Sequence, residues 1–152
     1  MSGVESYVRR ETLLSILINV VLSLAFFLIV FGTADQVPSR GAAGLAVDFI
    51  PQSFMIALMS TLVPGALTLR RVRAGALPRS SRSTRLPAKL VPRALLVAVL
   101  AVLIGAGIAG AVVWFWAPGT LGWLPALLIK LAYGGLLAAI TTPPGLRAAL
   151  RG

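Results

Sequence analysis

The chain contains no cysteine and no histidine among its 152 residues. Without cysteine it can form neither a disulfide nor a thiolate metal or redox site. Without histidine it lacks a common ligand of zinc and haem and the usual general base of serine and cysteine hydrolases. Only carboxylates, hydroxyls, amides and basic side chains remain for chemistry, and we expect neither a bound metal nor a cofactor.

Acidic residues are also scarce, since only 4 occur, and these are Glu5, Glu11, Asp35 and Asp48. Their spacing does not pair them, whereas general acid–base or metal catalysis needs groups that converge on one point. We therefore expect that the protein is not an enzyme.

Charged residues make up 12% of the chain and hydrophobic residues 58%, against about 25% and 45–50% in an average soluble domain. The hydrophobic residues form four apolar stretches, near residues 11–31, 48–69, 94–116 and 121–142. Each stretch has about 20 residues or more, which at a helical rise of about 1.5 Å crosses the roughly 30 Å hydrocarbon core of a bilayer. The sequence predicts an all-α, polytopic membrane protein, a single domain of four transmembrane helices.

Basic residues outnumber acidic ones, and the net charge is +10. A basic chain can bind nucleic acid, but twelve of the 14 basic residues flank the apolar stretches on one side, as is typical of a cytoplasmic face. We therefore expect that the protein does not bind nucleic acid. We also expect that its termini and the linker 70–93 are cytoplasmic and that it lies in a bacterial inner membrane. Trp114, Trp116 and Trp123 lie at the opposite ends of the third and fourth stretches, where an aromatic belt would mark the other interface.

The linker 70–93 is rich in arginine, serine and proline and has no acidic residue. Its charge would anchor the orientation of the chain, and it would also attract anionic lipid headgroups, by about 1 kcal/mol for each basic residue near the surface. The residues expected to contact such headgroups are Arg70, Arg71, Arg73, Arg79, Arg82, Arg85, Lys89 and Arg93.

A short internal similarity links the two halves of the chain. The segments TLVPG at 61–65 and TTPPG at 141–145 share Thr, Pro and Gly at matching places, each at the cytoplasmic end of the second helix of a hairpin. The halves would then be two repeated, parallel two-helix hairpins related by an axis along the membrane normal, as in some transporters. Chance similarity is the alternative, because the identities are few.

Polar residues recur at every fourth position of the first apolar stretch, at Glu11, Ser15, Asn19 and Ser23. Four residues make slightly more than one helical turn, so these side chains form one stripe that will not face lipid. The stripe either forms hydrogen bonds with neighbouring helices or lines a path for a solute. Glu11 lies near the interface, where it would either pair with Arg9 or Arg10 or favour the helix N-terminus electrostatically.

Lys130 is the one basic residue within an apolar stretch. A lysine at the centre of a transmembrane helix costs about 2.5–3.5 kcal/mol on insertion and usually faces a partner inside the protein. Alignment of the two motifs places Lys130 level with Ile50, within about 3 Å in depth of Asp48 and Gln52, which lie one helical turn apart. Asp48 is then the natural counter-ion, and Tyr133 would join the network. Alternatively, the lysine extends toward the outer interface, about 10 Å away.

Small residues recur every four positions in the last two stretches, as in Ala101, Gly105 and Ala109 and in Gly134 and Ala138. Such spacing predicts close approach of helices, within one chain or between copies. Four helices enclose little space, so a solute pathway would require an oligomer.

Two functions fit these features. The first is a small permease or channel-like protein that acts as a homo-oligomer, in which the polar residues of the apolar stretches contact a solute or ion. The second is an accessory or assembly subunit that binds another membrane protein through its polar and small-residue faces. The residues expected in the polar network are Asp48, Gln52, Lys130, Tyr133, Asn19, Ser15 and Glu11.

Overall fold

The computed structural model describes residues 3–80 and 85–151. Its elements follow in the order α1 (Gly3–Phe31), β1 (Gln36–Pro38), α2 (Leu45–Arg73), α3 (Leu90–Leu100), η1 (Ala101–Ala106), α4 (Gly107–Trp116), β2 (Thr120–Gly122) and α5 (Trp123–Ala149). The π-helical segment η1 joins α3 and α4 into one rod, which we call the third span. The four rods are long and apolar enough to cross a membrane, which confirms the predicted all-α, four-helix membrane fold.

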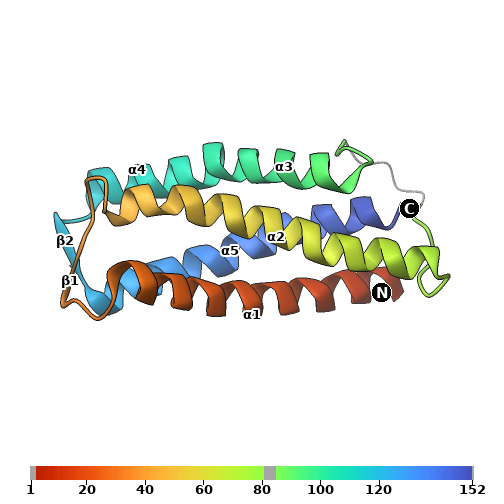
Figure 1. Ribbon diagram of the computed structural model, residues 1–152, viewed down its shortest axis with the longest axis horizontal. Coiled ribbons are helices and arrows are strands. Elements are labelled where there is room, and N and C mark those ends of the chain that lie inside the picture. The colour runs from red at the N-terminus through yellow and green to blue at the C-terminus, as the bar shows by residue number, and fades with distance from the viewer. Residues whose placement is uncertain (1–2, 81–84, 152) are drawn as a thin grey trace.

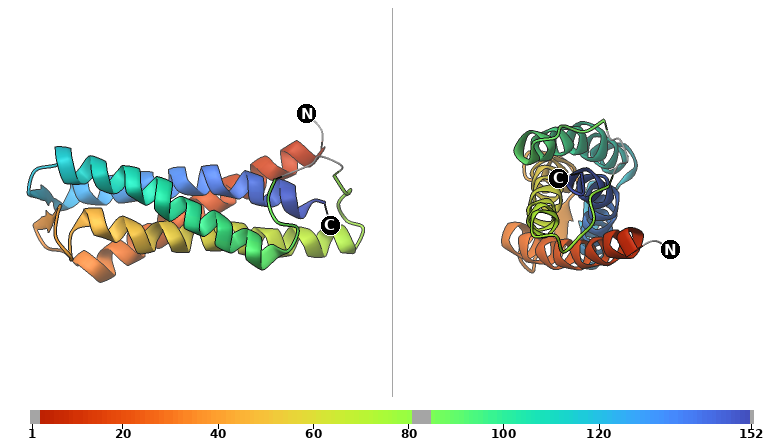
Figure 2. Two further views of the ribbon diagram at one scale, coloured as in Figure 1. Left: turned by 90° about the horizontal axis from the view of Figure 1, so that it is seen from above. Right: turned by 90° about the vertical axis from the view of Figure 1, so that its right-hand side faces the viewer.

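The four rods lie in three layers (Figure 2). The middle layer holds α2 and α5, with α1 on one side and the third span on the other. α1 packs mainly against α5, and the third span packs mainly against α2, so the first helix of each hairpin lies on the second helix of the other. This arrangement fits two parallel hairpins, while their origin by duplication stays a hypothesis.

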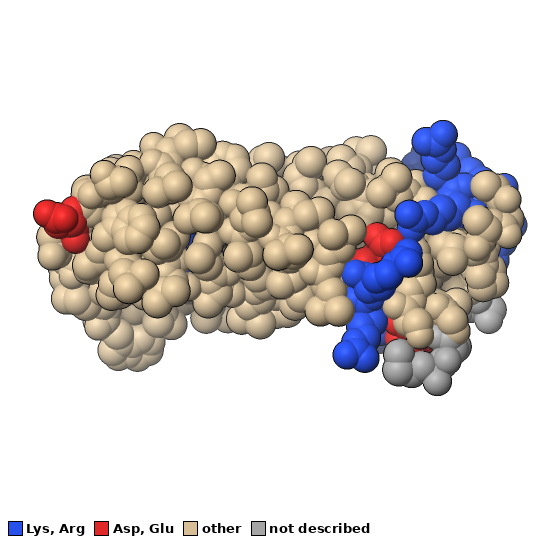
Figure 3. All heavy atoms as spheres, turned by 90° about the horizontal axis from the view of Figure 1, so that it is seen from below, with Lys and Arg blue, Asp and Glu red and all other residues tan. Residues whose placement is uncertain are grey.

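Both chain ends lie at the same end of the bundle (Figure 1). Lysine and arginine side chains gather at that end, while the rest of the face in Figure 3 is almost free of them. Along the bundle the exposed side chains are mostly large and apolar, as expected of surfaces that face lipid. Charge and apolar surface are thus separated along the long axis.

All four spans run beyond the apolar stretches that predict them. α1 begins at Gly3, and α5 continues through the Pro143–Pro144 pair to Ala149. Ion pairs hold these polar ends together, since Arg147 lies 3.3 Å from Glu5. The segment between the hairpins is shorter than predicted, because residues 70–73 and 90–93 are helical. An apolar stretch in the sequence identifies only the part of a helix that faces lipid. Its length therefore underestimates the length of a helix that has polar ends.

Two spans carry backbone irregularities. Pro51 lies inside α2, beyond its first turn, so its missing N–H leaves the carbonyl of Val47 without its usual helical donor. The π-helical turn η1 was not predicted from the sequence. It contains Gly105, where an added Cβ would lie 2.9 Å from the Tyr133 hydroxyl oxygen, so α5 approaches the third span closely there.

A two-stranded antiparallel sheet connects the hairpin loops at the end far from the termini. β1 pairs with β2 through Val37 opposite Leu121. Arg40 donates from Nε to the carbonyl of Trp114 at 2.6 Å and from Nη2 to that of Ala117 at 2.7 Å, so it satisfies carbonyls at the end of α4. These contacts hold the two hairpins together at this end.

Candidate functional site

A groove runs along the bundle between α1 and α2, which touch each other at few places. It consists of two adjoining cavities of about 220 and 170 Å³, both lined by Asn19, Leu22 and Met59. We call it the α1–α2 groove. A cavity with mostly apolar walls and a few convergent polar groups is the usual form of a small-molecule site.

The walls of the α1–α2 groove divide into apolar edges and a polar floor. The edges are exposed apolar side chains, and these are Leu14, Ile18, Leu22, Phe26 and Val30 from α1 and Met55, Met59, Val63 and Leu67 from α2. The floor is made of buried or half-buried polar side chains, and these are Glu11, Ser15, Asn19, Ser23, Asp48, Gln52, Ser60 and Lys130.

An ion pair between α5 and α2 lies at one end of the groove, far from the basic end of the bundle. We call this the inner end, and the cavity of about 220 Å³ beside it the inner cavity. Lys130 Nζ donates to Asp48 Oδ2, so the structure has the pair rather than the outward-extended lysine. The side chain of Lys130 is 1% exposed and that of Asp48 is 16% exposed. Lys130 Nζ also lies 5.7 Å from the centre of the Phe31 ring, within the range of a cation–π contact. The carboxylate is therefore the accessible charge of this pair.

Gln52 connects three helices beside the ion pair. Its Nε2 donates to Ser23 Oγ of α1 at 3.1 Å and to the carbonyl of Lys130 in α5 at 3.3 Å. Its Oε1 is buried and has no hydrogen-bond partner. Gly134 makes this junction possible, because an added Cβ there would collide with Ser23 Oγ. The inner end thus has an acceptor without a partner, while the Gln52 amide donor is already used.

The polar stripe of α1 continues along the floor and is held by hydrogen bonds. Asn19 Nδ2 donates to the carbonyl of Ser15 at 2.8 Å, and the Thr142 hydroxyl of α5 donates to Ser15 Oγ at 2.9 Å. Nearby, the hydroxyls of Ser60 and Thr141 join α2 to α5 at 2.8 Å. The stripe therefore both bonds α1 to α5 and lines the groove, as the two interpretations of the sequence pattern allow.

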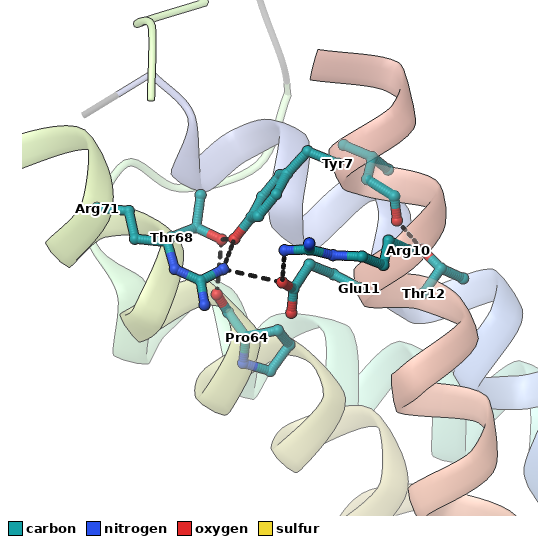
Figure 4. Close-up of polar contacts among 8 residues, drawn as sticks. Tyr7, Arg10, Glu11, Thr12, Pro64, Thr68 and Arg71 are labelled. Carbon is teal, nitrogen blue, oxygen red and sulfur yellow. Dashed lines mark hydrogen bonds and ion pairs between the residues drawn. The ribbon is translucent and has the colours of Figure 1, made fainter. Parts of the chain in front are cut away.

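A cluster of polar side chains closes the groove at the basic end (Figure 4). Arg71 Nη1 of α2 donates to Glu11 Oε1 at 2.8 Å and to the Tyr7 hydroxyl at 3.0 Å. The hydroxyls of Tyr7 and Thr68 lie 2.9 Å apart. Arg10 makes a longer contact of 3.5 Å with Glu11, so the closest partner of Glu11 comes from α2 rather than from the preceding arginines.

Tyr133 lies outside the groove. Its hydroxyl forms a hydrogen bond with that of Ser53, and its ring packs on Phe49 at 4.6 Å between centroids. It does not line either groove cavity, because it lies on the side of the middle layer that faces the third span. Tyr133 therefore joins α5 to α2 through Ser53, as a helix–helix polar contact, rather than through Lys130.

The basic residues of the linker have different surroundings. Arg93 is 0% exposed and its guanidinium donates to two backbone carbonyls, so the predicted contact with lipid headgroups is wrong for it. Arg71 is held by Glu11 but stays partly exposed, and Arg82 lies outside the described residues. The remaining members are exposed, and these are Arg70, Arg73, Arg79, Arg85 and Lys89.

Several hydroxyls that join the helices were not identified from the sequence. Ser53 and Ser60 each donate at 2.6 Å to the carbonyl four residues earlier, and Thr68 does so at 2.7 Å. A hydroxyl bonded in this way enters a membrane helix at little cost, so its presence gives little signal. The seven-residue spacing of Ser53 and Ser60 on one helix face was the available signal, but their partners lie on another helix.

Within residues 3–80 and 85–151, no group of three or more acidic side chains is placed to hold a metal ion. No known protein family, curated protein or solved structure matches this chain. The function is therefore inferred from the chemistry of the α1–α2 groove.

Proposed function

We propose that this protein is a small permease-like membrane protein that binds its solute in the α1–α2 groove. The observation that carries the proposal is the Asp48–Lys130 pair at the inner end of a cavity of about 220 Å³. Charges within a membrane span are costly, and a buried ion pair is often no more stabilising than apolar packing of the same volume. A role in binding therefore explains the pair better than stability alone.

We also propose a homo-oligomer in a bacterial inner membrane, with the basic end in the cytoplasm. Four helices enclose little space, so a pathway for a solute would require more than one copy. The concentration of arginine and lysine at the end with both termini supports the orientation (Figure 3). The exposed basic residues of that end would contact anionic lipid headgroups.

Transport is tested with purified protein in lipid vesicles. The solutes are glycerol, urea and potassium chloride, followed by light scattering, and medium-chain amphiphiles of each charge type, followed by the amount of amphiphile that the vesicles retain. We expect the wild type to accelerate the movement of at least one solute, and Lys130→Met to abolish that movement. The double variant Asp48→Asn with Lys130→Met has no unpaired charge, so it separates loss of function from misfolding.

The matched control is Thr61→Val. Thr61 Oγ1 is also buried without a partner, but Thr61 does not line the groove. Wild-type flux through the folded double variant, or no acceleration of any solute by the wild type, would contradict the proposed function.

A second candidate function is that of an accessory subunit. The third span and α2 border a shallow hollow of about 440 Å³, whose lining includes Ala106, Gly107 and Gly110. Small residues allow a helix of another membrane protein to approach there. Native mass measurement after extraction in mild detergent distinguishes the two functions, because a stoichiometric foreign protein supports an accessory role and a homo-oligomer supports transport.

A further inference from the structure

We infer that the ligand of the α1–α2 groove is a neutral amphiphile, with an unbranched apolar chain and an uncharged head that carries hydrogen-bond donors. Hydroxyl and amide N–H groups are the donors that fit. The inference rests on the proposed function, because it names the chemical class of the solute for the same groove.

The shape of the groove indicates entry from the lipid. At the basic end, the contacts of Arg71 with Glu11 and Tyr7 occupy the space between α1 and α2. Beyond Lys130, a buried apolar cluster that includes Phe27 of α1 and Leu45 of α2 fills the bundle. The long side between these two closures has exposed apolar edges. A ligand that enters through this side must have an apolar part.

The floor of the inner cavity offers acceptors to a ligand. Gln52 Oε1 is buried without a partner, and the Asp48 carboxylate is the exposed member of its ion pair. Two neighbouring donors are engaged, because Gln52 Nε2 already bonds Ser23 and the carbonyl of Lys130, and the ammonium of Lys130 is almost wholly covered. A buried acceptor without a partner is unfavourable, so a ligand that donates to it gains affinity. The head of the ligand is therefore a donor.

The charge of the inner cavity favours a neutral head. Asp48 and Lys130 are the only ionisable residues among the described side chains that line it, and their charges cancel. A cationic or anionic head would leave one uncompensated charge in a site that faces lipid, where ions are strongly disfavoured. An uncharged head avoids this cost and still bonds the acceptors.

The length and the edges of the groove suit an unbranched chain. From Asp48 to Leu67 the lining follows α2 for roughly 28 Å at the helical rise of 1.5 Å per residue. Met55 and Met59 border it, and methionine is unbranched and adapts its shape to a chain. The head would lie at the ion pair and the chain along the edges toward the basic end.

The test is equilibrium binding to the full chain in lipid nanodiscs, with empty nanodiscs measured in parallel to subtract partition into lipid. Each of four probes carries an unbranched chain of ten carbons, which in decanoate includes the carboxyl carbon. They are 1-O-decylglycerol, its 2,3-di-O-methyl ether, decyltrimethylammonium and decanoate. We expect saturable binding of 1-O-decylglycerol and affinities at least about tenfold weaker for the other three, because they lack donors, carry a charge, or both.

Two variants and one control locate the site. Gln52→Met removes the acceptor without a partner but keeps an unbranched side chain, and we expect it to weaken binding of 1-O-decylglycerol about tenfold. Leu22→Trp fills the groove from its edge and should abolish binding. Thr61→Val removes a buried oxygen outside the groove and should bind as the wild type does. Far-ultraviolet circular dichroism and elution as a single species show that each variant is folded.

Equal binding of 1-O-decylglycerol and its dimethyl ether would overturn the inference, because the groove would then take up any apolar chain. Preference for decanoate or decyltrimethylammonium would also overturn it. The result separates this inference from the proposed function. Binding in the expected order without flux in vesicles refutes transport alone, whereas flux of another solute that depends on Lys130, without binding of 1-O-decylglycerol, refutes the ligand class alone.

Discussion

Replacing Asp48 with asparagine should destabilise the protein more than replacing Lys130 with methionine. The side chain of Lys130 is 1% exposed, so the variant would hold a covered ammonium without its carboxylate. Loss of one partner from a buried pair costs about 3–5 kcal/mol. In Lys130→Met, the carboxylate that remains is 16% exposed and borders the groove. Water in the groove can then solvate it in part, so we expect a loss of about 2–3 kcal/mol, at or below the lower end of that range.

The double variant Asp48→Asn with Lys130→Met should be more stable than the sum of the two losses predicts. It contains no unpaired charge, and neutral replacement of a buried pair is often well tolerated. We expect a coupling free energy of about 2–3 kcal/mol, at the upper end for residues in contact. The measurement is unfolding in mixed micelles with increasing dodecyl sulfate, followed by circular dichroism for the wild type, both single variants and the double variant.

The Glu5–Arg147 pair provides a matched comparison. Its charged groups lie 3.3 Å apart, but the side chain of Glu5 is 37% exposed and that of Arg147 is 43% exposed, so the same double-variant cycle should give less than about 1 kcal/mol. Additive effects at Asp48 and Lys130, within about 0.5 kcal/mol, would refute the reasoning that the pair is electrostatically coupled within the bundle.

Two further predictions use the helix packing and the lack of cysteine. Gly134→Ala should destabilise the protein by about 1–3 kcal/mol in the same unfolding assay, because the added Cβ collides with Ser23 Oγ. The control is Gly107→Ala, whose added Cβ has no atom within 4 Å, and it should be neutral or slightly stabilising. The chain has no cysteine, so single cysteines can test its orientation. Gly119→Cys should react with a membrane-impermeant maleimide on intact cells and Ala76→Cys only after permeabilisation, because the exposed Gly119 precedes β2 and the exposed Ala76 follows α2, at opposite ends of the bundle. The reverse pattern would contradict cytoplasmic termini.

The depth of the Asp48–Lys130 pair could be predicted from the sequence, because depth follows from helical rise and from the two Thr-x-x-Pro-Gly segments. The buried stripe of α1 was predictable for the same local reason, since a polar side chain at every fourth position stays on one face. The network around Tyr133 and the exposure of Arg93 were not predictable. Both depend on which helix lies opposite, and the residue types alone do not contain that information.

The sequence by itself determined four membrane-spanning helices, the grouping of basic residues and the residues that avoid lipid, since each depends on composition or on the period of one helix. Only the tertiary structure decided that α1 packs on α5 and leaves a groove beside α2. Lipid is as apolar as a helix surface, so hydrophobicity does not choose between partners. Close steric fit makes the choice, as where Gly134 leaves room for Ser23 and Gln52 joins them across three helices.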